Sequence, residues 1–347
     1  MEQETGAIID TDVVIVGAGP AGLFQVFELG LLGIKAHVVD SLANPGGQCT
    51  ELYPDKPIYD IPALPVCGAQ ELVDRLLKQI APFEPAFHLG QEVAELQRRE
   101  DGGFFVRTAL GTRFHARTVV IAGGLGSFQP RRLVVPGADE FENRRVHYRV
   151  RSARDFHGQR LVILGGGDSA LDWVLDLHGK ASSIVHVHRR PEFKAAPASV
   201  ARMQQLAATG SLTYVEGVAT GLRHEDGQLL GITVKRADGT SVEFDADHVL
   251  AFFGLHPKLG PIADWHLELD RKAIKVDTAK FQTSIPGIYA VGDINTYPGK
   301  KKLILSGFHE AALAAFAIAE QLNPAKKVHL QYTTTSPIMH KRLGVPD

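Results

Sequence analysis

The sequence predicts an α/β protein with two Rossmann-like domains of the three-layer ββα type, the second inserted into the first. An apolar strand runs into a glycine-rich turn in residues 12–22 (DVVIVGAGPAG), and the pattern returns in residues 160–170 (RLVILGGGDSA). A strand and a long amphipathic helix near the C-terminus complete the first domain. We therefore expect one domain over residues 1–123 and 286–347 and the other over residues 124–285.

The elements of the first domain follow in a regular order. The β-branched run 13–16 predicts a strand, residues 23–33 have the apolar spacing of a helix, and residues 36–40 predict a second strand. Residues 104–124 predict a hairpin with Gly111 in its turn, followed by a buried strand. The double glycine that ends this segment is interpreted as a domain hinge.

The second domain repeats this order. Residues 171–177 predict a helix and residues 183–190 a strand, and residues 242–257 read as a hairpin arm, a buried strand and a glycine-proline exit. Residues 287–294 then predict a strand that enters a turn, and residues 305–322 predict the amphipathic helix that returns to the first domain.

The composition is that of an ordinary globular protein. Of the 347 residues, 44% are hydrophobic and 22% are charged, and the formal net charge is −2. A near-neutral charge argues against nucleic-acid binding, which needs a basic surface. The acidic N-terminus lacks the pattern of a secretory signal, and no stretch approaches the ~18 consecutive apolar residues of a membrane span. We expect a cytoplasmic protein with no nucleic-acid or membrane partner.

The first glycine turn has the spacing GxGxxG at Gly17, Gly19 and Gly22. The first glycine allows a tight turn, the second lets the backbone approach a pyrophosphate, and the third lets the helix pack closely on the strand. Asp40 ends the next strand, about 20 residues on, where an acid accepts hydrogen bonds from a ribose. The motif predicts a dinucleotide site, with a purely structural glycine turn as the alternative.

The second glycine turn predicts another phosphate site, but the following strand ends in basic residues instead of an acid. A guanidinium at this place pairs with a 2′-phosphate, which an acid would repel. The pattern therefore favours NADPH over NADH, with a solvated basic turn as the alternative. The predicted NADP(H) contacts are Gly165, Gly167, Asp168, Ser169, His188, Arg189, Arg190 and Lys194.

Two dinucleotide sites in one chain predict two cofactors, one of which passes a hydride to the other. FAD and NADPH are the natural pair. Asp293, in AVGD at the end of a predicted strand, is placed to bond the ribityl chain of a flavin. The N-terminus of the following helix then favours negative charge on the flavin pyrimidine. The flavin carries this chemistry, so we expect no catalytic side chain and no metal site.

Over nearly its whole length the chain resembles the thioredoxin reductases, a family of two-domain flavoproteins. The resemblance rests on GAGPAG from Gly17, PGGQ from Pro45, GGGDSA from Gly165, HRRPEF from His188 and AVGD from Ala290. Thioredoxin reductases carry a redox CxxC shortly before GGGD. The matching stretch here, HYRVRSARDFHGQR, contains no cysteine, so their disulfide relay cannot operate.

The branch without the cysteine pair is the thioredoxin-reductase-like ferredoxin–NADP reductases, and segments from Leu52 and Tyr297 are similar to it. The resemblance implies electron transfer through FAD between NADPH and ferredoxin, or flavodoxin in its place. It places Tyr53 against one flavin face. It also implies a homodimer whose C-terminal tail, here QYTTTSP from Gln331, covers the other face, with Tyr332 as the stacking candidate.

The resemblance adds further flavin contacts. Val93 matches a backbone contact near the adenine, Phe128 a hinge contact, and Thr334 a tail hydroxyl. The full predicted FAD set is Gly17, Gly19, Ala21, Gly22, Asp40, Gly47, Gln48, Tyr53, Val93, Phe128, Asp293 and Thr334.

Ferredoxins are acidic, so basic residues are expected near the flavin. Lys300, Lys301 and Lys302 follow Asp293 closely, and arginines gather around the hinge; a solvated basic face is the alternative reading. The arginines are Arg131, Arg132, Arg144, Arg145, Arg149, Arg151 and Arg154.

Two other functions remain open. Cys49 and Cys67 are the chain's only cysteines, and they would have to act as a redox pair if the protein reduced thiols or disulfides with NADPH. A flavin-binding redox sensor without catalytic turnover is the other, although a sensor has no evident need for the HRR sequence that selects NADPH.

Overall fold

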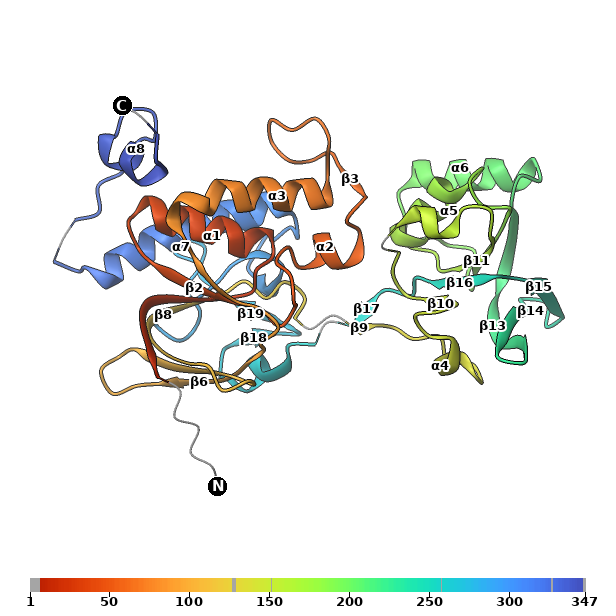
Figure 1. Ribbon diagram of the computed structural model, residues 1–347, viewed down its shortest axis with the longest axis horizontal. Helices are drawn as coiled ribbons and strands as arrows, with labels where there is room; N and C mark the ends of the chain where they lie inside the picture. The colour runs from red at the N-terminus through yellow and green to blue at the C-terminus, as the bar shows by residue number, and fades with distance from the viewer. Residues whose placement is uncertain (1–6, 127–128, 151, 257, 326, 346–347) are drawn as a thin grey trace, which may run out of the picture. The chain divides into compact units, whose positions relative to one another are not determined.

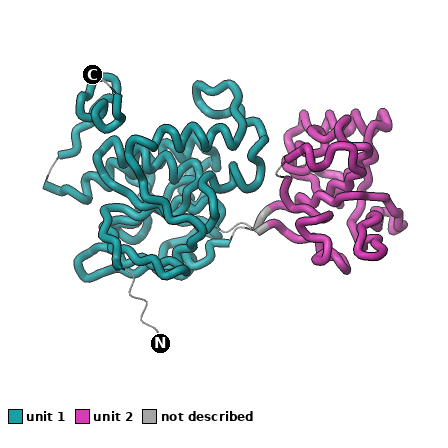
Figure 2. Tube along the Cα trace, in the orientation of Figure 1, with its two compact units in different colours: residues 1–127, 257–347 teal, residues 128–256 magenta. Residues whose placement is uncertain are grey.

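The computed structural model divides into two compact units, coloured separately in Figure 2. Unit 1 comprises residues 1–127 and 257–347, and unit 2 comprises residues 128–256, so the second unit is inserted into the first. The residues that the structure describes are 7–126, 129–150, 152–256, 258–325 and 327–345.

Unit 1 is built on a parallel sheet with helices on one face (Figure 1). Ile15 and Val38 belong to the core under these helices, whereas Val14 and Val39 belong to a core on the opposite face. Both faces of the strands are therefore buried, as in parallel sheets generally. The strand order is β5 (Ala86–His88), β2 (Ala36–Val39), β1 (Ile9–Val16), β8 (Arg113–Ile121) and β20 (Ile288–Ala290), and the helices are α1 (Pro20–Leu31), α3 (Ala69–Ile80) and α7 (Ile304–Leu322).

An antiparallel meander forms the third layer of unit 1. Strand β8 belongs to two layers. It pairs with β1 along most of its length, and on its other edge its first residues pair with β7 and its last residues pair with β20. Phe104, Val106 and Phe114 fill the core on this side, and Gly111 turns the predicted hairpin with a φ of +89°. The meander strands before β8 are β6 (Val93–Arg98) and β7 (Phe104–Thr108).

Short elements complete unit 1. No helix in the described ranges has the length and apolar character needed to cross a membrane. The short elements are α2 (Gln48–Leu52), β3 (Pro57–Ile58), β4 (Cys67–Gly68), η1 (Ala81–Phe83), η3 (Gly260–Asp264), β18 (Leu269–Asp270), β19 (Ala273–Lys275), η4 (Gly292–Ile294), β21 (Asn295–Thr296) and α8 (Pro337–Leu343).

Unit 2 repeats the three-layer plan. Leu161 and Ile163 belong to the core with helices α5 (Asp168–Leu177) and α6 (Pro197–Ala208), and Val162 belongs to the core with the meander. The parallel order is β10 (Val146–His147), β16 (His248–Ala251), β11 (Arg160–Leu164), β12 (Ser183–His188) and β13 (Thr213–Glu225), and β13 continues into the meander with β14 (Gln228–Arg236) and β15 (Ser241–Asp245). The predicted fold class is confirmed.

The chain enters and leaves unit 2 through two short antiparallel strands. These strands are β9 (Gln129–Pro130) and β17 (Leu255–His256). The remaining elements of unit 2 are the short helices α4 (Ala138–Phe141) and η2 (Ala153–Phe156).

The units differ from the predicted domains mainly over residues 257–285, which are predicted for the second domain but belong to unit 1. Ile262, Trp265 and Ile274 are buried in the meander core of unit 1 together with Phe114. This segment contains only short strands and a 3₁₀ turn, so its sequence has no periodicity that reveals which core it joins.

Two glycines of the first turn are required by direct contact between backbones. Gly17 has a φ of +116°, and a Cβ on it would lie 2.4 Å from the carbonyl oxygen of Ala122. A Cβ on Gly22 would lie 2.0 Å from the carbonyl oxygen of Gly17, whereas one on Gly19 would meet no atom within 4 Å. The packing of α1 on the sheet therefore depends on Gly17 and Gly22 but not on Gly19.

Gly22→Ala should lower the stability of the ligand-free protein by about 1–3 kcal/mol, because its Cβ overlaps a backbone carbonyl that cannot move away freely. Gly19→Ala is the matched control and should melt like the parent protein. The melting temperature by circular dichroism checks both. An equal fall in melting temperature in the two variants would show that the contact between Gly22 and the Gly17 carbonyl does not determine stability.

Candidate functional site

The first glycine turn joins β1 to the N-terminus of α1. The N–H of Gly17 donates to the carbonyl of Val39 at 2.8 Å, and Gly19 caps the helix with open space on its Cβ side. Gly47 of a neighbouring loop lies beside it, since a Cβ on Gly47 would be 3.2 Å from the Gly19 Cα. The first N–H groups of a helix have no intrahelical acceptor. The turn is therefore an open cradle for an anion.

Asp40 lies just beyond β2, and its carboxylate holds the turn together. Oδ2 accepts the N–H of Ala18 at 2.6 Å, and Oδ1 accepts the N–H of Leu42 at 2.8 Å. Burial raises the pKa of Asp40, and these two donors oppose the rise. Each carboxylate oxygen keeps a second lone pair, so a ribose hydroxyl can still donate to it. Asp40 thus also has a structural role, which its place at a strand end does not reveal.

Asp293, in η4, lies beside the same turn. The preceding residue, Gly292, has a φ of +78°. A Cβ on Gly292, or on Gly307 of α7, would lie 3.1 Å from the Cβ of Ala21 in α1. These contacts pack η4 and α7 against the first turn of α1. Asp293 therefore shares one edge of unit 1 with the glycine turn, although it lies 271 residues after Gly22 in the sequence.

Gln48 begins α2 and Tyr53 directly follows it, near this edge. Nε2 of Gln48 lies 3.5 Å from the position that a Cβ on Gly124 would take. Tyr53 is half-buried, and the Sγ of Cys49 lies 3.9 Å from its hydroxyl. Burial, followed by the nearby Cys49 and Asp293, raises the pKa of Tyr53. The phenol therefore stays protonated at neutral pH, and its ring carries no charge.

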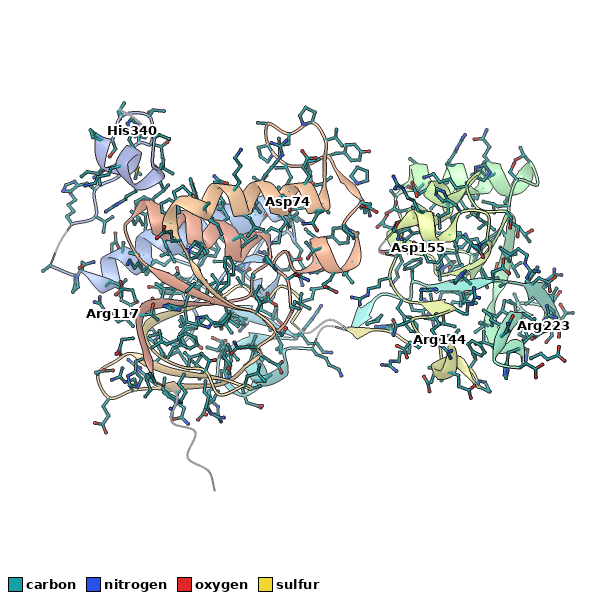
Figure 3. The ribbon with its side chains drawn as sticks, in the orientation of Figure 1. Asp74, Arg117, Arg144, Asp155, Arg223 and His340 are labelled. Atoms are coloured by element: carbon teal, nitrogen blue, oxygen red, sulfur yellow. The ribbon has the colours of Figure 1, made fainter. Side chains whose placement is uncertain are left out.

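The C-terminal tail holds Tyr332 and Thr334 away from these residues. Helix α8 packs against α1 and η1, and Arg342 donates to the carbonyl of Leu31 at the C-terminal end of α1. The glycine turn is at the other end of α1, and α8 and α2 lie at opposite ends of unit 1 (Figures 1 and 3). Tyr332 is 66% exposed. Within one chain, the structure does not bring the tail to Gln48 and Tyr53, the residues predicted to lie near the flavin ring.

The two remaining flavin candidates have different outcomes. Val93 is buried at the start of β6, and Gln91 just before it donates its N–H to the carbonyl of Asp40 at 2.9 Å. Val93 therefore adjoins the Asp40 side of the site. Phe128 lies outside the described residues. Besides Val93, the candidates that the structure brings together are Gly17, Gly19, Ala21, Gly22, Asp40, Gly47, Gln48, Tyr53 and Asp293.

The glycine turn of unit 2 has the same construction. The N–H of Gly165 donates to the carbonyl of Val187 at 3.0 Å, and a Cβ on Gly165 would lie 2.4 Å from the carbonyl oxygen of Phe252. Gly167 caps α5, and a Cβ on it would meet nothing within 4 Å. Ala170 stands where the first turn has its third glycine. Unit 2 therefore offers a second open cradle.

The basic end of β12 lies against this second turn. A Cβ on Gly166 would lie 2.2 Å from Nε2 of His188, and the N–H of Lys194 donates to the carbonyl of Gly166 at 2.7 Å. Oδ1 of Asp168 accepts the N–H of Ala196 at 2.8 Å, which ties the start of α5 to the segment after the basic residues. The structure thus gathers the predicted NADP(H) contacts at one edge of unit 2.

Side chains that can bind an anion face solvent at this edge, beside the exposed carboxylate of Asp168. Arg189, Arg190, Lys194 and Ser169 are all exposed. No ion pair joins Arg189 or Arg190 to another residue in the described ranges. Both guanidinium groups are therefore available to a phosphate.

His186 supports the second glycine turn from within the core. Its side chain is fully buried, and Nε2 lies 2.7 Å from the carbonyl oxygen of Gly165. Burial lowers the pKa of His186 to about 4, so the ring is neutral at pH 7 and donates Nε2–H to that carbonyl.

The basic residues expected to meet an acidic partner do not behave alike. Lys301 and Lys302 are exposed, but the side chain of Lys300 is only 6% exposed and its ammonium pairs with Glu310. The interpretation of Lys300 as a surface cation was wrong, because its ammonium is buried in an ion pair with a carboxylate on α7. No local sequence pattern marks this pair.

The arginines that the sequence places near the predicted hinge, as far as the structure describes them, lie in unit 2. Arg132 pairs with Glu142 at 2.9 Å, and Arg144, labelled in Figure 3, donates to the carbonyl of Glu140. Both side chains are exposed. Arg151 lies outside the described residues.

Cys49 and Cys67 should be unreactive in the native protein at pH 7. Both are free and 2% exposed, and burial raises the pKa of Cys49 to about 11 and also raises the pKa of Cys67. The thiolate is the reactive form, so its scarcity below the pKa protects both thiols. Mass spectrometry after iodoacetamide treatment, at several pH values and with unfolded protein as the control, measures this. Rapid native labelling at pH 7 would contradict it.

Comparison with known proteins gives the same picture. Residues 11–318 match the family model described as pyridine nucleotide-disulphide oxidoreductase. The chain is 65% identical over 336 residues to a protein of Cupriavidus necator named ferredoxin–NADP reductase 2, covering 97% of this chain and 91% of that protein. It is 61% identical over 341 residues to a ferredoxin–NADP reductase of Methylibium petroleiphilum, covering 97% and 93%.

Solved structures agree on the fold. A thioredoxin reductase from T. acidophilum has a TM-score of 0.76 and 25% identity, covering 90% of this chain and 99% of that one. A thioredoxin reductase from Lactococcus lactis has a TM-score of 0.75 and 24% identity, with the same coverage. The family match over residues 11–318 agrees with the two glycine cradles, and the chain therefore belongs to the pyridine nucleotide-disulphide oxidoreductase family.

Proposed function

We propose that this oxidoreductase is a ferredoxin–NADP reductase, which transfers electrons through FAD between NADPH and ferredoxin, or flavodoxin in its place. The observation that carries the proposal is the presence of two open cradles in one chain, with Asp40 beside the first and Arg189 and Arg190 beside the second. The names of the relatives support the choice of reaction and of partner.

Unit 1 is the FAD domain in this proposal, and its residues fit the cofactor. Gly19 leaves room for a pyrophosphate at the N-terminus of α1, and Asp40 keeps lone pairs for a ribose. Asp293 is available to the ribityl chain, and the uncharged ring of Tyr53 to the flavin face. FAD, when bound, supplies the conversion between a two-electron donor and a one-electron carrier. The chain's own residues bind and orient, and none of them is required as an acid or base.

Unit 2 is the NADPH domain. Gly165 and Gly167 present the start of α5 to the pyrophosphate, with Asp168 and Ser169 in its first turn. The basic residues at the end of β12 and after it, His188, Arg189, Arg190 and Lys194, surround the place of the 2′-phosphate.

The proposal includes a cytoplasmic homodimer. The tail is held at the far end of α1, and its Tyr332 and Leu330 are 66% and 63% exposed. A side chain placed in this way is free to reach the flavin of a second copy. Tyr332 and Thr334 are therefore assigned to the partner subunit's flavin site.

The other two functions have less support. A dithiol reductase needs a reactive thiolate, and burial keeps Cys49 and Cys67 protonated. A sensor without turnover does not need the exposed pair Arg189 and Arg190.

Arg189→Ala/Arg190→Ala should raise the KM for NADPH by about 10- to 100-fold, because charge-assisted bonds to a phosphate are lost. The KM for NADH should change little, since NADH has no 2′-phosphate. Arg236→Ala, an exposed arginine on β14 of the same unit, is the control and should keep both values. Steady-state kinetics with both nucleotides decides the matter. An equal rise for NADH and NADPH would place the two arginines outside 2′-phosphate recognition.

NADPH-driven cytochrome c reduction by the purified flavoprotein should be strongly stimulated by an acidic ferredoxin. Cys49→Ser and Cys67→Ser should both retain this activity, because neither thiol takes part. A parallel assay with thioredoxin and a disulfide dye should stay at background. Turnover only in the disulfide assay, and its loss in the cysteine variants, would reverse the choice of function.

A further inference from the structure

Glu310, on α7, is a carboxylate with no exposed surface. It accepts the N–H of Gly292 at 2.7 Å, Nδ2 of Asn295 at 2.8 Å and the hydroxyl of Tyr297 at 2.9 Å, and it pairs with Nζ of Lys300. A buried charge is tolerated only when it is paired and hydrogen-bonded. All four donors come from the short segment between β20 and α7. Glu310 therefore holds that segment in place through hydrogen bonds to four of its residues.

Lys300 also contacts the backbone and a side chain of this segment. Its Nζ donates to the carbonyl of Gly292 at 2.9 Å and lies 5.4 Å from the centre of the Tyr297 ring. The N–H of Gly292 goes to Glu310 and its C=O goes to Lys300. One buried ion pair thus fixes both polar backbone groups of a single residue.

That residue directly precedes Asp293. The carbonyl held by Lys300 belongs to the peptide plane that also contains the N–H of Asp293. Gly292 is confined sterically as well, since a Cβ on it would lie 3.1 Å from the Cβ of Ala21 in the first turn of α1. The direction in which Asp293 leaves the backbone is therefore set by the ion pair and by the packing of α1.

The charges around Asp293 include the same pair. Burial raises the pKa of Asp293, while Lys302 and Lys300 lower it and Glu310 raises it. Lys300 and Glu310 together contribute no net charge, so removal of one member changes the charge beside Asp293 by one unit.

We propose that Lys300 and Glu310 are positioning residues of the flavin site, a clamp on Gly292 that presets Asp293 for the ribityl chain and keeps the neighbouring charge balanced. The inference rests on the proposed function, in which unit 1 binds FAD. It also reassigns Lys300 from partner docking to cofactor binding.

Three variants test the clamp. Lys300→Met removes the donor to Gly292 and the ion-pair partner of Glu310, which keeps three other donors, so the chain should fold but melt at a lower temperature. Lys300→Met/Glu310→Gln removes both charges, and it replaces the single variant in the measurements if that variant is unstable. Lys301→Met, at the exposed neighbouring lysine, is the matched control. The measurements are the melting temperature of the apoprotein, the Kd for FAD from flavin fluorescence, and the midpoint potential of bound FAD.

Lys300→Met should raise the Kd for FAD about tenfold, the effect of one charged hydrogen bond. It should also lower the midpoint potential, because the unpaired Glu310 carboxylate opposes the negative charge that FAD gains on reduction. The double variant should recover the potential but keep the raised Kd, since Gly292 still lacks its donor. Lys301→Met should match the parent protein in all three measurements.

A parental Kd and potential in both Lys300 variants would overturn the clamp, whatever their melting temperatures, because a purely structural ion pair affects stability alone. Failure of the parent apoprotein to bind FAD is a separate result. It would remove the proposed function before any variant is compared.

Discussion

Direct contact between backbones at the start of α1 is the constraint on which the rest of unit 1 depends. Gly22 lies against the carbonyl of Gly17, and Gly17 lies against that of Ala122, so α1, β1 and β8 meet without intervening side chains. From the other side, η4 and α7 reach Ala21 because Gly292 and Gly307 have no Cβ. Segments from both ends of the chain therefore converge on one helix N-terminus, whose unpaired N–H groups are then directed at a ligand.

Buried polar side chains hold the functional loops by binding their backbones. Asp40 accepts N–H groups from the first glycine turn and the loop after β2, His186 supports Gly165, and Glu310 with Lys300 supports Gly292. A loop held in this way keeps its shape before a ligand arrives, so less conformational entropy is lost on binding.

Much of the fold could be predicted because its signals are local. The glycine turns, the hairpin at Gly111 and helix α7 have strong periodicity or a positive φ that glycine accepts, and the structure has them as expected. Asp40 and Asp293 could be placed because strand ends in a parallel sheet share one edge.

The misses have a common physical origin, since each depends on contacts distant in sequence. Lys300 reads as one of three surface lysines until a carboxylate on another element neutralises it, and residues 257–285 have no period that assigns them to a core. The tail position of Tyr332 depends on the docking of α8 through Arg342. No property of these segments taken alone contains that information.

The paired strands at the two ends of unit 2 bear on how such a protein can be assembled over evolutionary time. Pro130 faces Leu255 in their ladder, and on the unit 1 side Gly126 and Lys258 form a bridge. In each unit, the two places where the chain crosses to the other unit therefore lie side by side. One excision and one short closing turn would separate the units without breaking a strand of either main sheet, so the inserted unit is a module that recombination can exchange whole.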